Sequence, residues 1–362
     1  MDRVVTFSRS RNDSDRLAVQ PPLLLIRADA SPEIGAGHVM RCLALAKVWQ
    51  NTGGNVVCVM AESILALEDR LVHEGVHVKK ISAAPGSQTD AEQAIAEALR
   101  ARARWIVVDG YRFAPAYVRS LKAAGLRTLF LDDDGRFDFY PADVVLNQNI
   151  SANSLMYHKR EASTRLLLGS DYVLLRPEFL AETQARERPA TARRVLITMG
   201  GSDPDNVTRK ALLALLQTKA KLEAKIVIGA GNSWQDELEV LADKRREFEL
   251  VKNPSNMAPL LRWADIAISG AGGTAWELAF LGVPAVVVAL SQDQREIAEG
   301  LARNDVAVSL GWHANLSPEQ IGDALHGLID NQERRLAMSE RGQKLVDGRG
   351  AERVVAFLQN SL

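Results

Sequence analysis

The chain has 362 residues, of which 47% are hydrophobic and 25% charged. Because single hydrophobic cores stop growing at roughly 250–300 residues, this length predicts about two domains. Lys and Arg number 44 against 45 Asp and Glu, which gives a formal net charge of -1. Such a balance excludes a general basic field for nucleic acid or an anionic membrane, so any phosphate binding must be local.

The cysteine pattern and the N-terminal segment bear on the compartment. Cys42 and Cys58 lack metal-site spacing, and we expect buried, reduced thiols. No apolar run approaches the ~20 residues that span a bilayer. Residues 1–22 lack the apolar segment of a secretory signal and are expected to form a disordered extension. We therefore expect a cytoplasmic protein.

The first half of the chain alternates short apolar runs with amphipathic stretches. Seven runs are expected to be strands: Leu23–Ile26, Val56–Met60, Val76–Ile81, Trp105–Asp109, Thr128–Leu131, Val144–Leu146 and Leu166–Leu168. Four helices are expected between them, at about Val39–Asn51, Ser63–His73, Ala91–Arg102 and Pro115–Ala124. Continuous apolar strands that alternate with helices indicate a parallel sheet covered on both faces.

A polar segment, residues 181–191, has no apolar periodicity and reads as an interdomain linker. The alternation then restarts, with strands expected at Val195–Thr198, Lys225–Ile228, Phe248–Val251, Ile266–Ser269, Ala285–Val288 and Val306–Ser309. Helices are expected at Asp205–Gln217, Trp234–Arg246, Met257–Trp263, Ala275–Leu281, Gln292–Arg303, Pro318–Asn331 and Glu333–Leu358.

The fold class is thus α/β, with two Rossmann-like, doubly wound domains that face a central cleft. The first domain is expected to span residues 23–183, and the second to span residues 184–362 with all of the C-terminal helices. Ligands of such sheets bind at the carboxyl ends of the strands.

The first motif, residues 27–43, joins a strand to a helix through Gly35-Ala36-Gly37-His38. Glycines let a backbone approach a ligand closely, and the N–H groups at a helix start favour an anion. The positive end of the helix dipole keeps a histidine at this place neutral, as a general base requires. A plain turn with a satisfied histidine is the alternative, but Asp29 and Arg41 nearby favour function. The six-residue dinucleotide fingerprint is absent.

The second motif, residues 199–206, follows a strand and carries Gly200, Gly201 and Ser202. Ser202 or Asp203 can cap the following helix, with Pro204 in its first turn. Capping does not explain the paired glycines, which would admit a phosphate or a substrate to the main chain.

The third motif, residues 269–277, again opens a helix after a strand and includes Gly272, Gly273 and Thr274. It is a second candidate phosphate cradle. Thr274 and Glu277 have the spacing of a capping box, in which the glutamate binds the threonine N–H. Alternatively Glu277 accepts hydrogen bonds from ribose hydroxyls, and the residues alone leave both interpretations open.

Several weaker candidates also follow strands. Asp109-Gly110-Tyr111 could line the cleft, and Asp132-Asp133-Asp134 is expected to be a hydrogen-bonded turn rather than a metal site. Asn147-Gln148-Asn149 would suit sugar hydroxyl or acetamido groups, or form a turn. Gln294 is expected either to face the ligand or to begin a helix.

These motifs together resemble the UDP-2,4-diacetamido-2,4,6-trideoxy-β-L-altropyranose hydrolases of pseudaminic acid biosynthesis. The resemblance rests on residues 27–46, 109–111, 132–133, 146–149 and 168–179 and on both glycine-rich turns, and it extends from residue 23 onward.

The resemblance implies a GT-B-like fold related to the MurG-type glycosyltransferases, with UDP mainly on the C-terminal domain. It implies that Glu277 holds the ribose, that the glycine-rich turns face the pyrophosphate and that His38 is the base. It also implies no metal and no cofactor. The resulting set of substrate-binding residues is Gly35, Gly37, Arg41, Asp29, Tyr111, Asn147, Gly200, Gly201, Ser202, Gly272, Gly273, Thr274, Glu277 and Gln294.

The expected reaction is hydrolysis of the C1–O bond with inversion, which releases UDP and the free sugar. Arg41 and the helix N-termini would stabilise the departing phosphate. Alternatives are a GT-B glycosyltransferase that uses a UDP-sugar donor, a hydrolase of a related UDP-sugar, a 2-epimerase and a non-catalytic UDP-sugar-binding protein. The expected partner is the UDP-sugar, with no nucleic acid and no membrane span, and the sequence leaves oligomeric partners open.

Overall fold

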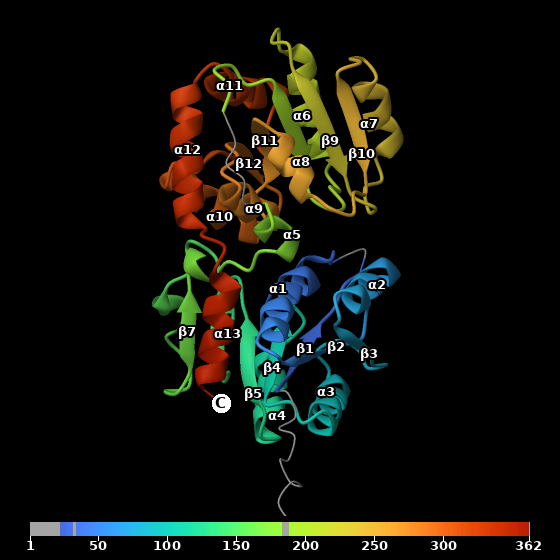
Figure 1. The fold of residues 1–362 in the computed structure, drawn as a ribbon, viewed down its shortest axis with the longest axis vertical. Helices are drawn as coiled ribbons and strands as arrows, with labels where there is room; N and C mark the ends of the chain where they lie inside the picture. The colour runs from blue at the N-terminus through green and yellow to red at the C-terminus, as the bar shows by residue number, and fades with distance from the viewer. Residues whose placement is uncertain (1–21, 32–33, 183–187, 362) are drawn as a thin grey trace, which may run out of the picture.

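The structure is a computed structural model that describes residues 22–31, 34–182 and 188–361. These residues form two parallel sheets, each with helices on both faces (Figure 1). Successive side chains of a buried strand pack into two different cores, one on each face of the sheet. Leu24 and Ile26 pack into the core on one face of the first sheet, whereas Leu25 packs into the core on the other. Both faces are therefore apolar, which explains the continuous hydrophobic runs in the sequence.

The first sheet has seven strands in the order β3-β2-β1-β4-β5-β6-β7. Their bounds are β1 Leu23–Ala28, β2 Asn55–Met60, β3 His77–Lys80, β4 Trp105–Asp109, β5 Arg127–Leu131, β6 Val144–Asn147 and β7 Arg165–Leu168. The helices α1 Gly37–Asn51, α2 Leu65–His73, α3 Gln88–Arg100 and α4 Pro115–Ala123 connect the first five strands.

The second sheet has six strands in the order β10-β9-β8-β11-β12-β13. Their bounds are β8 Arg194–Thr198, β9 Glu223–Ile228, β10 Phe248–Lys252, β11 Ile266–Gly270, β12 Ala285–Ala289 and β13 Ala307–Trp312. The helices of this half are α5 Pro177–Leu180, α6 Val207–Gln217, α7 Gln235–Ala242, α8 Ala258–Trp263, α9 Gly273–Phe280, α10 Gln292–Arg303, α11 Pro318–Ile329 and α12 Gln332–Leu345. All expected strands are present, which confirms two doubly wound sheets.

The end of the chain departs from expectation. The helix expected over Glu333–Leu358 is two helices, because the chain breaks around Gly348, whose φ is 80°, before α13 Gly350–Asn360. Helix α13 lies on the first domain (Figure 1), where Val354 and Leu358 join the core beside β1. The indole N–H of Trp105 donates to the Leu358 carbonyl at 3.2 Å. The expectation that all C-terminal helices belong to the second domain is therefore wrong for α13.

Two other expectations fall where the structure gives no description. Residues 1–21 of the expected N-terminal extension lie outside the described residues, and so does the expected domain boundary at residues 183–184. Within the described part of the chain, no helix is both long and apolar enough to cross a membrane.

The strand order places the functional loops. In the first sheet the order reverses between β1 and β4, and in the second between β8 and β11. Crevices outside the carboxyl ends of strands at such switch points are where doubly wound sheets bind ligands. The three glycine-rich motifs follow β1, β8 and β11, so each lies at a switch point.

Candidate active site

A cavity of about 550 Å³ lies between the two domains and is lined by residues of both. This volume is within the range of small-molecule sites. The first domain contributes the Gly35–His38 loop with Arg41, and the second contributes the turns at Gly200–Gly201 and Gly272–Thr274. The structure thus brings together loops that are separated by more than 150 positions in the sequence.

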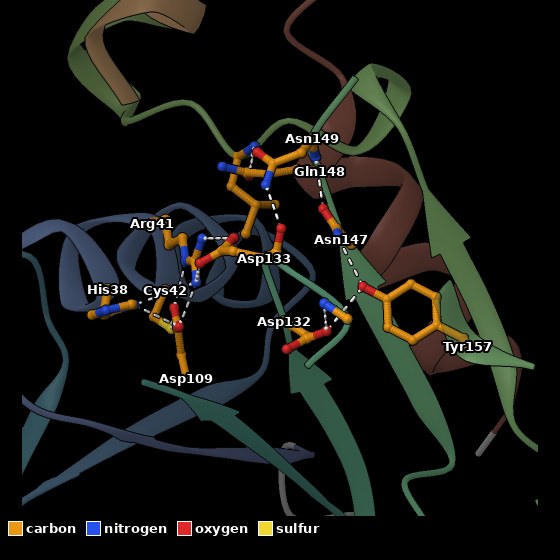
Figure 2. A network of polar contacts seen from close by, with 12 residues as sticks. His38, Arg41, Cys42, Asp109, Asp132, Asp133, Asn147, Gln148, Asn149 and Tyr157 are labelled. Carbon is orange, nitrogen blue, oxygen red and sulfur yellow. Dashed lines mark hydrogen bonds and ion pairs between the residues drawn. The ribbon is translucent and has the colours of Figure 1, made fainter. Parts of the chain in front are cut away.

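His38 is the second residue of α1, and its imidazole faces the carboxylate of Asp109 at the end of β4 (Figure 2). Its Nδ1 atom lies 2.8 Å from Oδ1 of Asp109. Asp109 is completely buried, whereas His38 is 8% exposed and lines the cavity. The histidine is therefore held from the protein side and open toward the cavity.

Arg41, one turn further along α1, completes this cluster. Its Nε donates to Asp109 Oδ2 at 2.6 Å and its Nη2 to Asp109 Oδ1 at 2.6 Å. The other edge of the guanidinium pairs with Asp133 after β5, with Nη1 2.7 Å from Oδ1. Because these two carboxylates accept from four of the five Arg41 N–H donors, the expected role of Arg41 on a departing phosphate loses support. Its contacts fit a residue that fixes Asp109.

The charges around Asp109 determine which histidine tautomer is present. Burial alone would raise the pKa of Asp109, but Arg41 and His38 hold it well below its usual range. Asp109 is then an ionised carboxylate that can only accept hydrogen bonds. The His38 Nδ1 must therefore carry a proton in this contact, so Nε2 is the ring nitrogen that can act as a proton acceptor.

Tyr111 packs against the imidazole from the cavity side. The two rings make an edge contact with centroids 4.8 Å apart, and the Arg136 guanidinium lies 5.3 Å from the Tyr111 centroid. The tyrosine is 49% exposed, so it borders the open part of the cavity. This packing restricts rotation of the His38 side chain.

Two cavity-lining glycines of the second domain are not explained by the fold. Gly201 and Gly273 have ordinary φ values, and a Cβ built at either meets no atom within 4 Å. Gly200 differs, because its φ of 85° favours glycine by itself. At Gly201 and Gly273 neither strain nor packing requires a missing side chain, and a ligand in the cavity could approach the backbone closely at both.

Glu277 does not form the capping box that its spacing with Thr274 suggested. Helix α9 begins at Gly273 with Gly272 as its N-cap, and no side chain caps it. The Glu277 Oε1 instead accepts from Arg176 Nε at 2.8 Å. Its Oε2 is buried without a hydrogen-bond partner, although Glu277 lines the cavity. Burial raises the pKa of Glu277, whereas Arg176 and the Thr274 side chain oppose this effect. Because Oε2 has no partner in the protein, it could accept a hydrogen bond from a ligand.

The turn before α6 uses Asp203, one of the two expected capping residues, but Pro204 does not lie in the first turn. The helix begins at Val207, so Pro204 lies before its first turn. The carboxylate of Asp203 accepts the N–H groups of Val207 and Thr208 at 2.8 and 2.9 Å. Asp203 therefore has a capping role that does not involve the preceding glycines.

Polar groups after β5 and β6 form the wall beside Arg41 (Figure 2). Asp133, Gln148 and Asn149 line the cavity. Asp132 instead accepts from the hydroxyls of Tyr140 and Tyr157 at 3.0 Å each, as a hydrogen-bonded turn requires. Within the described ranges no group of three or more His, Cys, Asp or Glu could hold a metal ion.

Three of the expected substrate-binding residues do not line the cavity. Asp29 forms an ion pair with Arg27 at 2.7 Å and accepts the N–H of Ala61 at 2.8 Å. It therefore links the end of β1 to the residue after β2. Asn147 is 1% exposed and forms a turn. Ser202 packs beside Gly231. The remaining expected residues all border the cavity: Gly35, Gly37, His38, Arg41, Tyr111, Gly200, Gly201, Gly272, Gly273, Thr274, Glu277 and Gln294.

Sequence reasoning omitted several cavity residues from its set of sites. Asp133, Gln148, Asn149 and Asp293 all follow strands, and that position is a signal which could have been weighted more strongly. Arg176 follows no strand or glycine turn. Its approach to Glu277 depends on the chain path between the two domains, which no local pattern indicates.

The second half of the chain matches a known domain family. The model of the glycosyltransferase family 28 C-terminal domain matches residues 195–353, which covers the second sheet and most of its helices.

Three curated proteins are similar to the chain. A protein of Methanocaldococcus jannaschii is 27% identical over 75% of this chain and 57% of its own length. The spore coat polysaccharide biosynthesis protein SpsG of Bacillus subtilis is 28% identical over 55% of this chain and 60% of its own. The matches thus span less than two thirds of these two proteins. The UDP-2,4-diacetamido-2,4,6-trideoxy-beta-L-altropyranose hydrolase of Campylobacter jejuni is 24% identical over 79% of this chain and 98% of its own.

Solved structures establish the fold. MurG of Acinetobacter baumannii superposes with a TM-score of 0.67 at 19% identity, over 94% of this chain and 100% of its own. HepE of Anabaena in complex with UDP-glucose superposes with a TM-score of 0.62 at 13% identity, over 94% and 100%. The chain has a GT-B-like fold, as expected.

Proposed function

We propose that this protein is a UDP-sugar hydrolase that cleaves the C1–O bond of UDP-2,4-diacetamido-2,4,6-trideoxy-β-L-altropyranose, a step of pseudaminic acid biosynthesis. The observation that carries the proposal is the His38–Asp109 pair, which leaves the His38 Nε2 open toward the cavity. On the other domain, the glycine turns leave the backbone uncovered, and Glu277 has a carboxylate oxygen without a hydrogen-bond partner. A base and a nucleotide-holding surface thus face one cavity.

The second domain is suited to a nucleoside diphosphate. Gly201 and Gly273 admit phosphate oxygens to the main chain, and the N-terminus of α9 offers N–H groups to an anion. The free Oε2 of Glu277 can accept a ribose hydroxyl. UDP complexes are known for GT-B neighbours, among them HepE, and the similarity to the Campylobacter hydrolase favours UDP as the carrier.

The chemistry follows from these positions. The His38 Nε2 removes a proton from water as the water oxygen attacks C1 of the sugar. The bond between C1 and the β-phosphate oxygen breaks, and its electron pair leaves with UDP. The N–H groups at α9 stabilise this developing negative charge. Attack from the face opposite UDP inverts the anomeric centre, and the proton stays on His38 until solvent removes it.

A glycosyltransferase is the second candidate, because the matching family model is that of a glycosyltransferase domain. The same base would then deprotonate an acceptor hydroxyl instead of water. A transferase turns over only with an acceptor, whereas a hydrolase consumes the UDP-sugar in water alone.

Incubation of the UDP-sugar in ¹⁸O-labelled water, with product analysis by NMR and mass spectrometry, tests the proposal. We expect complete turnover without an acceptor, label on the sugar C1 hydroxyl and inversion. Label in UDP would mean attack at phosphorus and would contradict the mechanism. Turnover that requires an added acceptor would favour the transferase.

The His38→Asn variant tests the base. We expect kcat to fall by about 10²–10⁴-fold, the usual contribution of acid–base catalysis, with UDP affinity preserved. Near-normal kcat in this variant would remove His38 from the base role.

A further inference from the structure

The turn after β6 forms one wall of the cavity (Figure 2). The side-chain amide of Asn147 holds this turn, and its oxygen and its nitrogen both have hydrogen-bond partners. Its Oδ1 accepts the N–H of Asn149 at 2.9 Å, and its Nδ2 donates to the Tyr157 hydroxyl at 2.8 Å. Asn147 therefore holds the turn, and the next two residues, Gln148 and Asn149, line the cavity.

The side-chain amide of Gln148 has a defined orientation. Its Oε1 accepts the backbone N–H of Leu174 at 3.0 Å, a contact that the amide nitrogen could not replace. The Nε2 group is left with two N–H donors. It has no hydrogen-bond partner among the described residues and is not one of the buried unsatisfied atoms. These donors are therefore accessible from outside the protein, and Gln148 is a residue of the cavity lining.

Asn149 offers the complementary group. Its Nδ2 donates to the backbone carbonyl of Asp133 at 2.8 Å, so its Oδ1 remains as an acceptor. The residue is only 4% exposed, yet it lines the cavity, and its Oδ1 is not a buried unsatisfied atom. One wall thus presents amide donors and an amide acceptor from consecutive residues, both fixed by the protein.

Two apolar side chains of one core also line the cavity. Leu174, whose N–H orients Gln148, and Met40 of α1 both line the cavity. A ligand group that matches this surface has a carbonyl oxygen, an N–H and a methyl group. An N-acetyl substituent has all three, whereas a hydroxyl in its place leaves the apolar surface in contact with water.

We propose that Gln148 and Asn149 select an acetamido substituent of the sugar. The Gln148 Nε2 donates to the acetamido carbonyl, the Asn149 Oδ1 accepts the acetamido N–H, and the methyl group packs against Leu174 and Met40. The proposal rests on the proposed function for the sugar-nucleotide class, and it adds which residues decide the substituent.

Binding of three UDP-sugars by isothermal titration calorimetry tests this proposal. The probes are UDP-2,4-diacetamido-2,4,6-trideoxy-β-L-altropyranose and its two analogues with a hydroxyl at C2 or at C4. A His38→Asn background slows turnover during the titration. We expect at least one analogue to bind about 10-fold or more weakly than the parent, since a group with an unmet hydrogen bond costs about 1–3 kcal/mol.

The Gln148→Glu variant keeps the acceptor for Leu174 but replaces both donors with an acceptor. We expect this variant to lose most of the preference for the parent UDP-sugar over its hydroxyl analogues. Its affinity for UDP alone should stay within about 3-fold of the native value. Gln235→Glu, the same chemical change at the start of α7 and outside the cavity, should keep the preference. Leu174→Ala, which retains the backbone N–H, should reduce it.

The outcomes separate this proposal from the proposed function. Equal binding of parent and analogues, or a preference that survives Gln148→Glu, would overturn the acetamido site even if hydrolysis occurs. A preference that Gln148→Glu abolishes, in a protein that does not hydrolyse the parent, would support the site and overturn the proposed reaction.

Discussion

His38 and Asp109 are 71 positions apart in the chain, and their side chains meet with 2.8 Å between Nδ1 and Oδ1. The pair exists because β1 and β4 are neighbours in the sheet, with Ala28 beside Asp109 in the register. The loop after β1 and the end of β4 therefore open on the same crevice. The carboxylate then determines which nitrogen of the histidine is free.

Asp109→Asn should reduce kcat by about 10³–10⁴-fold with little change in UDP affinity. The asparagine amide can donate to Nδ1 and place the proton on Nε2, which removes the lone pair from the cavity. Steady-state kinetics with the UDP-sugar, with UDP titration alongside, measures both effects.

Asp133→Asn is the matched control, because it removes the other carboxylate from Arg41 and leaves the His38 contact in place. We expect a clearly smaller loss of kcat. Equal losses in the two variants would mean that Arg41, rather than the histidine tautomer, is what Asp109 supports.

Glu277→Gln should weaken UDP binding by about 10–100-fold, since hydrogen bonds to a charged group contribute about 1.5–3 kcal/mol. The variant should also discriminate less between UDP and 2′-deoxy-UDP than the native protein does. Glu178→Gln removes another acidic neighbour of Arg176, which lies 3.3 Å from Glu178, and should bind UDP normally. Equal weakening in both variants would indicate an effect through Arg176 alone.

The thiols of Cys42 and Cys58 should be inert in the folded protein at pH 8. Burial raises the pKa of Cys58 from 9.0 to about 12, and burial with Asp109 nearby raises that of Cys42 well above its usual value. A disulfide-exchange reagent should react with both thiols only in denaturant. Rapid reaction in the native state would contradict this burial.

The same shifts predict how stability depends on alkaline pH. Because the folded-state pKa values are raised, the unfolded chain loses its thiol protons first. The thiol contribution is therefore fully present below about pH 9 and declines as the pH rises toward 12. Urea unfolding between pH 8 and pH 11 measures the decline, and a double Cys→Ala variant should show less of it.

Leu358→Ala should lower the free energy of unfolding by about 2–5 kcal/mol, the usual cost of such a change in a core. Leu358 is completely buried in the core of the first domain. Urea unfolding followed by tryptophan fluorescence is the measurement, since Trp105 contacts the Leu358 carbonyl. The control is Leu336→Ala on α12, where the side chain is 42% exposed. An equally small loss of unfolding free energy in both variants would mean that α13 is not part of that core.

The order of the strands and helices, the glycine turns and His38 were all accessible from the sequence. Alternating apolar runs follow from burial on both faces of a sheet, and glycine and histidine at a strand–helix junction are local features. A local pattern is ambiguous where two roles share a spacing. Glu277 illustrates this, because its capping-box spacing is real while its carboxylate pairs with Arg176 from another segment.

The sequence by itself determined two doubly wound domains and which loops lie at the carboxyl ends of their strands, because hydrophobic periodicity and turn chemistry act over a few neighbouring residues. Only the tertiary structure decided that Asp109 orients His38, that Arg41 is occupied by two carboxylates and that α13 returns to the first domain. These contacts join segments distant in the chain. Their energies depend on burial and on charges brought together by folding, which no local pattern encodes.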